Sequence, residues 1–428
     1  MLKQFHLFKK KSYFLFLLLL ANVGFSQVNK EISLEQLQQL VVNYYPTLKQ
    51  QLMYGKLAES KKQLLNTNYL PQISLVGTAT YQSEVTKFNF SIPGATTFNQ
   101  KQDQYSVGLE LKENIFDYGA IKTQKKIEQL IAESQNKQID ADFIKVKERI
   151  EQLYSTIQLC VENLSILALK QVELTTKQKR VSSLVQNGAG LKSSLLVIEA
   201  EILMTEQKIA EVNSMKQTCI EVLSLLTNQK FDATTRFKDI ETNATLKVTL
   251  NRPESQLFEL QKNTNSLREK MITKSNLPKV YVFGRGYYGR PGYNFLNNDF
   301  RTYGMVGVGL NWNLSSYYTS GKEKKNLQIA SELITVQKEA FELNVQTLLV
   351  QQKEEILKLE KLIEMDLKIQ AIKKEILAVS SSQLDNGIIT SAEFITDLNA
   401  DQQARTTTSM HQIQLAMVKR AYNTTLGF

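Results

Sequence analysis

Apolar and polar residues alternate one by one in four segments of the chain, two in each half. The segments lie near residues 73–81, 105–112, 280–289 and 306–314. A period of two places apolar side chains on one face of a β-strand and polar ones on the other. Each segment is about ten residues long, the length that a tilted strand needs to cross a bilayer. The pattern therefore predicts four strands that could span a membrane.

Two much longer segments, 122–186 and 322–385, contain no proline, and their apolar residues recur at mixed steps of three and four. This spacing predicts α-helices that pack as coiled coils. At a rise of 1.5 Å per residue, each helix would be about 100 Å long. The segments 34–68 and 193–227 predict helices of about 50 Å, and similar pieces precede Leu277 and follow Ile389. Two long helices, each matched in length by two shorter helices placed end to end, suggest a helical tube.

The two halves of the chain follow the same order. Two proline motifs recur after 207 residues: Leu70-Pro71 recurs as Leu277-Pro278, and Tyr45-Pro46 recurs as Arg252-Pro253. The turn motif Asn187-Gly188 recurs as Asn386-Gly387 after 199 residues. Self-similarity at this period indicates a duplicated unit rather than a short-period solenoid. The predicted unit is short helix, strand, loop, strand, long helix, turn and helix.

The first 26 residues have the pattern of a secretory signal peptide. Four lysines precede an apolar run at 14–21, and Gly24 and Ser26 supply small residues before Gln27. The run is shorter than the roughly 20 residues of a spanning helix, although an uncleaved anchor remains the alternative. We expect the following division: signal peptide 1–26, first repeat 27–228, linker 229–250, second repeat 251–428.

Four strands are too few to close a membrane barrel, for which about eight are the minimum. An open sheet edge is not tolerated in lipid. If the strands span a membrane, several chains must therefore combine them. The alternative is a soluble pair of hairpins packed on the helices. Other than these strands and the leader, no segment suggests a membrane span.

Composition argues against catalysis. The chain has 2 histidines, and only His411 lies beyond the signal peptide, so a metal site with several histidines is excluded. The glycines at 284–289 lie in a predicted strand and do not open a helix, as a dinucleotide-binding loop would. Removal of the leader with its four lysines lowers the net charge from +10 to +6. The remaining chain has no basic cluster typical of nucleic-acid binding. We expect no enzyme activity, cofactor or nucleic-acid partner.

Both cysteines of the chain, Cys160 and Cys219, fall inside predicted helices. An exported protein could join them in a disulfide. We favour two buried free thiols.

The order of elements resembles the TolC family of outer membrane efflux proteins over essentially the whole mature chain. No single motif is specific, but their ordered duplication is. The motifs are Ser33-Leu34-Glu35-Gln36 with Tyr45-Pro46-Thr47-Leu48, Asn251-Arg252-Pro253-Glu254, Leu70-Pro71-Gln72-Ile73 with Leu277-Pro278-Lys279-Val280, Asn114-Ile115-Phe116-Asp117-Tyr118-Gly119, Trp312-Asn313-Leu314, and the two Asn-Gly turns.

This resemblance implies a mainly α fold with β-strands: a long α-helical coiled-coil barrel and four transmembrane β-strands per chain. A homotrimer would complete a 12-stranded barrel in the lipid of the cell outer membrane, with the helical part in the periplasm. The protein would be a passive exit duct of a tripartite efflux or type I secretion system. A periplasmic adaptor (membrane fusion protein) would open it, and an inner-membrane pump would supply the energy.

The resemblance also implies roles for six residues. The two tip turns would contact the adaptor through Asn187, Gly188, Asn386 and Gly387. Counting from Gly387, the first acidic position of the family's pore constriction falls on Glu393. The second falls on Thr396, and the neighbouring Asp397 is the acidic residue available. Plain helical hairpins and a solvated carboxylate are the alternatives for the turns and for Glu393.

Two other classes of protein share some of these features. A periplasmic adaptor also has long helical hairpins, but it usually has one hairpin flanked by compact β-domains. A coiled-coil structural envelope protein would not repeat strand pairs at fixed places. The cargo cannot be identified from the residues of the duct.

Overall fold

The computed structural model describes residues 31–87, 99–232, 235–239 and 245–428. The expected signal peptide and part of the expected linker lie outside these residues. The chain forms two compact units, each built from three separate stretches of sequence. We call them the helical unit (Met1–Tyr45, Lys147–Leu246, Gln352–Ala421) and the sheet unit (Pro46–Val146, Lys247–Gln351, Tyr422–Phe428).

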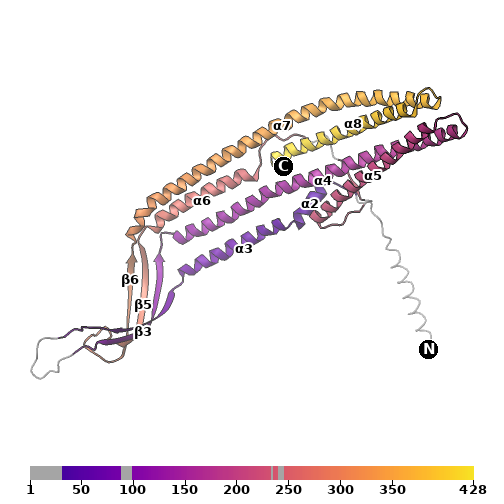
Figure 1. Cartoon of the computed structure of the whole chain (residues 1–428). Helices are drawn as coiled ribbons and strands as arrows, with labels where there is room; N and C mark the ends of the chain where they lie inside the picture. The colour runs from indigo at the N-terminus through magenta and orange to yellow at the C-terminus, as the bar shows by residue number, and fades with distance from the viewer. Residues whose placement is uncertain (1–30, 88–98, 233–234, 240–244) are drawn as a thin grey trace, which may run out of the picture. The chain divides into compact units, whose positions relative to one another are not determined.

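The sheet unit contains four antiparallel strands in the order β2-β3-β5-β6. Figure 1 shows β3, β5 and β6 side by side. Their bounds are β2 Gln72–Tyr81, β3 Asp103–Phe116, β5 Lys279–Arg290 and β6 Arg301–Asn311. The alternation of apolar and polar residues therefore predicted all four strands.

The last strand ends earlier than the alternation indicates. Strand β6 ends at Asn311, and the next residue, Trp312, donates a hydrogen bond from its indole Nε1 to the carbonyl of Asn276 (3.0 Å). Leu314 begins the 3-10 turn η2 (Leu314–Ser316). Asn311 pairs with Lys279, the first residue of β5, and Pro278 before it has no amide hydrogen with which to extend the ladder. Strand β6 therefore ends where its partner ends, which periodicity alone cannot show.

One face of the sheet is apolar, and the other carries polar, charged and aromatic side chains. The register pairs Ile73 with Leu111, Leu75 with Leu109, and Val282 with Val308. Side chains of paired residues share a face, and most of these are exposed in the single chain. On the other face, Arg285 lies 3.5 Å from the carboxylate of Glu110. A large exposed apolar face is typical of a surface that lipid or a partner covers.

Each strand pair lies between a short helix and a long one. The short helices of the sheet unit both begin with proline, whose fixed φ suits the first helical position. Their bounds are α3 Pro46–Asn66, followed by the 3-10 turn η1 Thr67–Tyr69, and α6 Pro253–Ser275; the long helices are α4 Ala120–Gln186 and α7 Tyr317–Asp385. Lys61 pairs with Glu128 across α3 and α4, and Lys338 with Glu259 across α7 and α6.

The first predicted helix is divided into two. Tyr45 has an extended backbone (φ −60°, ψ 123°) between α2 (Leu34–Tyr44) and α3. Proline disfavours helical geometry in the residue before it, and this explains the break at Pro46.

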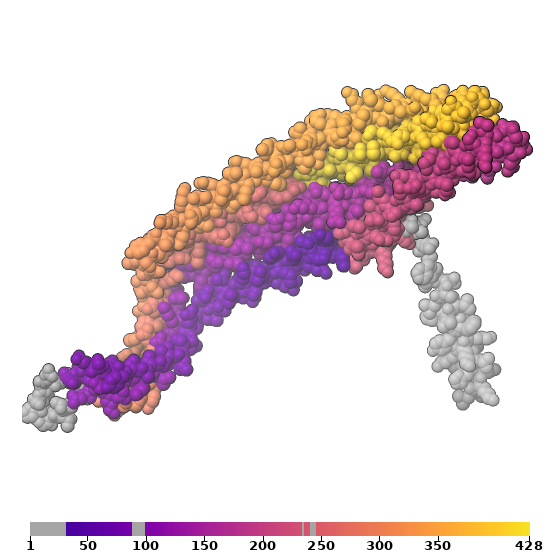
Figure 2. Space-filling view, in the orientation of Figure 1, coloured from indigo at the N-terminus to yellow at the C-terminus, as the bar shows by residue number. Residues whose placement is uncertain are grey.

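The helical unit contains α2, α5 (Lys192–Thr227), all but the last residues of α8 (Ser391–Thr425) and the later parts of α4 and α7. Lys170 of α4 pairs with Glu201 of α5 at 2.6 Å. Figure 2 shows α8 lying along α7, where His411 contacts Asp366 at 2.6 Å. The helices are thus held together as two neighbouring hairpins.

A small parallel sheet in the helical unit was not apparent from the sequence. Strand β1 (Glu31–Ile32) pairs with β4 (Arg236–Phe237). The hydroxyl of Tyr154 is within hydrogen-bonding distance of the carbonyls of Ile32 and Lys238. Burial raises the pKa of Tyr154, so its hydroxyl keeps the proton that it donates. Strands of two residues are too short to produce a periodic pattern.

The predicted apolar stripe of α4 is buried: Ile150, Tyr154 and Ile157 are at most 1% exposed. Cys160 and Cys219 are buried and unpaired within the described part of the chain. Burial raises the pKa of both thiols. In this structure they behave as small apolar residues.

The order of elements is the same in both halves, as the duplicated motifs predicted: short helix, two strands, long helix, turn, helix. No helix among the described residues has the length and apolar character required to cross a membrane.

Candidate functional site at the two interhelical turns

The two Asn-Gly turns have the same backbone structure. Gly188 has φ +72° and Gly387 has φ +69°. The amide of Ala189 donates to the carbonyl of Leu184 (2.8 Å), and the amide of Ile388 donates to that of Gln383 (2.9 Å). The amide of each glycine donates to the carbonyl of the residue three positions earlier, Val185 for Gly188 and Leu384 for Gly387. The two hydrogen bonds together form a Schellman motif in each turn. The duplication therefore extends to individual hydrogen bonds.

Glycine is required at these positions by the backbone and not by crowding. No atom lies within 4 Å of the point where a Cβ of Gly188 or Gly387 would be. Only the positive φ disfavours other residues. Asn187 and Asn386 precede the glycines and are exposed, as a surface that binds a partner requires.

The two turns belong to one packed cluster of the helical unit. Phe394 of α8 is fully buried and packs with Leu174 and Val181 of α4, Ile198 of α5 and Leu384 of α7. All four helices that enter or leave the turns contribute to this core. The sequence predicted two turns, and the structure brings them together.

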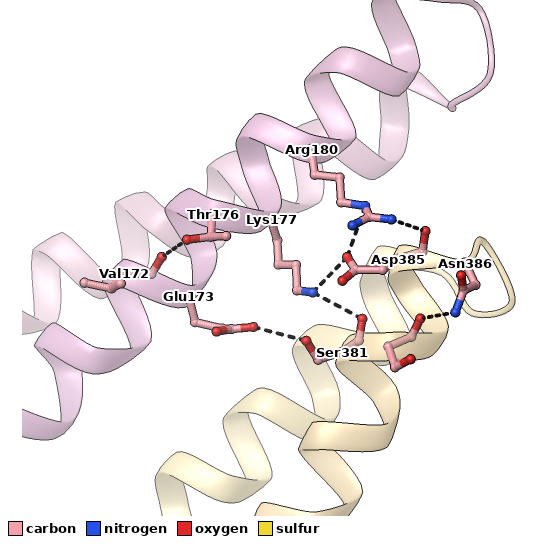
Figure 3. A network of polar contacts seen from close by, with 9 residues as sticks. Val172, Glu173, Thr176, Lys177, Arg180, Ser381, Asp385 and Asn386 are labelled. Carbon is pink, nitrogen blue, oxygen red and sulfur yellow. Dashed lines mark hydrogen bonds and ion pairs between the residues drawn. The ribbon is translucent and has the colours of Figure 1, made fainter.

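A polar network joins α4 to the end of α7 beside the turns (Figure 3). The buried ammonium group of Lys177 lies 2.8 Å from Oδ1 of Asp385 and donates to the carbonyl of Ser381 (3.1 Å). Arg180 donates to the carbonyl of Asp385 (2.7 Å). The ammonium group of Lys177 also lies 5.6 Å from the ring centroid of Phe394. One lysine thereby contacts both α7 and α8.

Sequence reasoning missed this network, although a signal was present. Buried positions of α4 follow steps of three and four: Leu167, Lys170, Leu174, Lys177 and Val181. Two lysines thus occupy core positions of a coiled coil. Such positions are polar when a specific partner is needed, since an unpaired buried ammonium is strongly disfavoured.

Glu393 caps a helix. Its carboxylate accepts a hydrogen bond from the amide of Thr390 (2.7 Å), and its own amide donates to the Thr390 hydroxyl (3.2 Å). This reciprocal pair is a capping box at the start of α8. The backbone hydrogen bond from Thr390 lowers the pKa of Glu393, which is exposed in the single chain. The carboxylate is therefore fixed and ionised at neutral pH.

Asp397 lies one turn further along α8 and is half-buried. It accepts a hydrogen bond from the hydroxyl of Ser380 in α7. The two carboxylates thus have different surroundings in the single chain. A common role in a pore constriction stays a prediction for both.

The described residues contain no group of three or more histidine, cysteine, aspartate or glutamate residues that could hold a metal ion.

A sequence model of the outer membrane efflux protein family matches residues 37–229. Comparison with curated protein sequences gives no match.

Solved structures share the fold. VceC of Vibrio cholerae has a TM-score of 0.68 at 12% identity, over 92% of this chain and 96% of that one. CusC has a TM-score of 0.69 at 14% identity, over 95% and 94%. The open state of the Neisseria gonorrhoeae channel MtrE has a TM-score of 0.67 at 13% identity, over 92% and 88%. At such identities the likeness concerns the fold alone.

Four strands with an exposed apolar face, joined to long paired helices, define an outer membrane channel with transmembrane strands. The first half of the chain matches the outer membrane efflux protein family, the TolC family, and the chain shares the fold of solved channels over most of its length. It is an efflux channel of the outer membrane, and the family is not enzymatic. The resemblance seen in the sequence is confirmed.

Proposed function

We propose that three copies of this chain form a passive exit duct of a tripartite efflux or type I secretion system. Channels of the TolC family form trimers. The observation that carries the proposal is the open sheet: in the described part of one chain, β2 pairs only with β3 and β6 only with β5. Both edges must be paired in lipid, and three chains supply twelve strands for a closed barrel.

The two turns are the proposed contact for a periplasmic adaptor. Ala189 and Ile388 follow the turn glycines and are exposed. The shared core beneath the turns supports this proposal, because a partner that contacts both turns would act on one packed unit. Energy for transport would come from an inner-membrane pump, with which the duct has no direct contact.

Glu393 and Asp397 are the proposed acidic residues of the pore constriction. A trimer would place three copies of each around one axis. Carboxylates that converge in a narrow ring repel one another and attract cations, as in other cation-selective pores. The capping box supports this role for Glu393, since it fixes the carboxylate in one position.

Native mass measurement of the purified protein in detergent tests the trimer. We expect three chains, separating to one on heating. A stable monomer that still forms ion channels in bilayers would overturn the proposal.

Labelling of cysteines tests where the turns lie. We place single cysteines at Ala189, Ile388 and Asn294 in a variant without Cys160 and Cys219. Asn294 lies in the connection between β5 and β6 and is exposed, so it should react with an impermeant thiol reagent in intact cells. Cysteines at 189 and 388 should react only after the outer membrane is opened, and should cross-link to an adaptor. Labelling of either turn in intact cells would contradict the assignment.

A further inference from the structure

Positive charge is concentrated where the helices of the sheet unit meet the strands. Figure 1 shows α3 and α6 ending, and α4 and α7 beginning, at the same edge of the sheet. We call residues 57–66, 117, 120–129, 266–275 and 317–326 the basic belt. It contains eleven lysine and arginine residues and five acidic ones, a net charge of +6. Without the leader the whole chain also carries +6, so the charges elsewhere balance one another.

Four lysines of the basic belt are exposed and unpaired. Lys122 and Lys126 lie one turn apart on α4, and Lys322 and Lys325 lie about one turn apart on α7. Each pair therefore shares a helix face. All four side chains are exposed, and none forms an ion pair with a residue that the structure describes.

Two acidic residues of the basic belt are engaged elsewhere. Glu128 of α4 pairs with Lys61 of α3 at 2.9 Å. Asp117 accepts hydrogen bonds from the amides of Gly119 (2.9 Å) and Ile121 (2.8 Å) at the start of α4. These carboxylates do not neutralise the four exposed lysines.

Exposed aromatic side chains lie beside the basic belt, between the strands and the helices. Phe116 and Tyr118 follow each other at the end of β3, with ring centroids 4.5 Å apart, and Trp312 follows β6. Tyr317 and Tyr318 begin α7 and are 48% and 84% exposed. Tyrosine and tryptophan are enriched at the level of lipid headgroups, because their rings are apolar and their polar atoms stay in contact with water. These aromatic residues therefore indicate that the bilayer ends where the strands end.

The exposed lysines are close enough to this edge to act on lipid headgroups. Lys126 lies six residues into α4 and Lys325 eight into α7, which is about 9 and 12 Å along the helices at 1.5 Å per residue. The headgroup layer extends about 5–7 Å beyond the hydrocarbon. Charges act over about 8 Å at physiological salt, so an anionic headgroup layer would lie within range of the basic belt.

We propose that the basic belt binds the phosphate groups of anionic phospholipids in the leaflet that adjoins the helices. Lysine ammonium groups bind phosphate as point charges. The apolar face of the sheet continues into the belt, so one lipid contacts the apolar face with its acyl chains and the lysines with its headgroup. A free phosphate ion would meet only the lysines. The proposal requires strands that lie in lipid, and it is independent of the proposed trimer and adaptor.

Native mass measurement of the full-length protein in detergent tests the proposal. Phosphatidylglycerol and phosphatidylcholine with the same acyl chains are titrated against it, and bound lipid is counted per chain, so the result is readable for a monomer or a trimer. We expect phosphatidylglycerol to bind at least about tenfold more tightly, since each lysine near an anionic surface contributes about fivefold. Raising the salt concentration should weaken this preference.

Two outcomes would overturn the proposal. Equal binding of the two lipids at low salt would show that the belt does not recognise the anionic headgroup. Displacement of phosphatidylglycerol by an equal concentration of glycerol 3-phosphate would show a site for free phosphate rather than a lipid-binding surface.

A charge variant assigns the binding to the basic belt. Lys122→Gln, Lys126→Gln, Lys322→Gln and Lys325→Gln are combined, because glutamine keeps a high helix propensity and removes the charge. Binding of phosphatidylglycerol should fall at least about tenfold, toward that of phosphatidylcholine. Unchanged binding would contradict the site. Should the combined variant fail to fold, the salt dependence of the parent protein decides, and a preference that salt does not weaken would overturn the proposal.

The matched control removes the same charge from a distant part of α7. Glutamine replaces Lys353, Lys361, Lys373 and Lys374, all of which lie at least 36 residues beyond Tyr317 in the sequence. This variant should bind phosphatidylglycerol as the parent does. Equal losses in the two variants would show that net charge, and not the basic belt, attracts the lipid.

Discussion

Lys177 of α4 places its ammonium group 2.8 Å from Oδ1 of Asp385, the last residue of α7. The lysine side chain is 6% exposed and that of the aspartate 27%. The pair therefore joins the two halves of the duplicated chain directly beside the turn that contains Gly387. An arrangement that separates α4 from the end of α7 must break this pair.

Asp385→Asn should destabilise the helical unit. Lys177 would keep its hydrogen bond to the carbonyl of Ser381 but would lose the negative charge of Asp385. Removing one partner of a fully buried pair costs about 3–5 kcal/mol, and partial exposure of Asp385 reduces this to about 1–3 kcal/mol. Denaturant titration should show a lower midpoint. Glu375→Gln, an exposed position on the same helix, should leave the midpoint unchanged; equal shifts would contradict a specific role for Asp385.

Gly387→Ala should destabilise the turn by about 1–2 kcal/mol, because an L-residue disfavours the left-handed conformation. The matched control is Gly321→Ala in α7, where nothing lies within 4 Å of the added Cβ. Alanine inside a helix is favoured by about 0.5–1 kcal/mol over glycine, so this variant should be more stable. Thermal unfolding of both variants checks this: the midpoint should fall for Gly387→Ala and rise for Gly321→Ala. Two shifts in the same direction would contradict the conformational explanation.

Glu393→Gln should separate capping from pore chemistry. Glutamine also serves at this position of a capping box, so folding and trimer formation should be retained. If three copies of Glu393 line the constriction, the variant should lose cation selectivity and be blocked less by multivalent cations in planar bilayers. Glu375→Gln again serves as control. Unchanged conductance and block in Glu393→Gln would remove Glu393 from the constriction.

Leu75→Lys and Ser74→Lys should differ sharply in membrane insertion. The two residues are neighbours in β2 and lie on opposite faces, with Leu75 on the apolar one. A lysine on a lipid-facing position near the midplane costs about 2–4 kcal/mol. The amount of folded protein in outer membrane fractions should fall for Leu75→Lys and stay near the parent level for Ser74→Lys, where the register places Glu110 opposite. A larger loss of folded protein for Ser74→Lys than for Leu75→Lys would show that Leu75 does not lie on the lipid-facing side of the sheet.

Much of this fold could be predicted from local sequence patterns. Alternation at 73–81 predicted β2 and the long run at 122–186 predicted α4, because period-two and period-3.6 patterns follow directly from backbone geometry. The turn at Gly188 was predictable for the same reason, since only the local backbone conformation demands glycine there.

Other features depend on pairs of residues far apart in the sequence. Nothing near Lys177 indicates Asp385, 208 residues later. The sequence by itself determined the helices, the strands, their duplication and the family. Only the tertiary structure decided which lysines are buried and which carboxylate caps α8. Burial and hydrogen bonding depend on what packs against a residue, and a periodic pattern specifies a face without naming its partner.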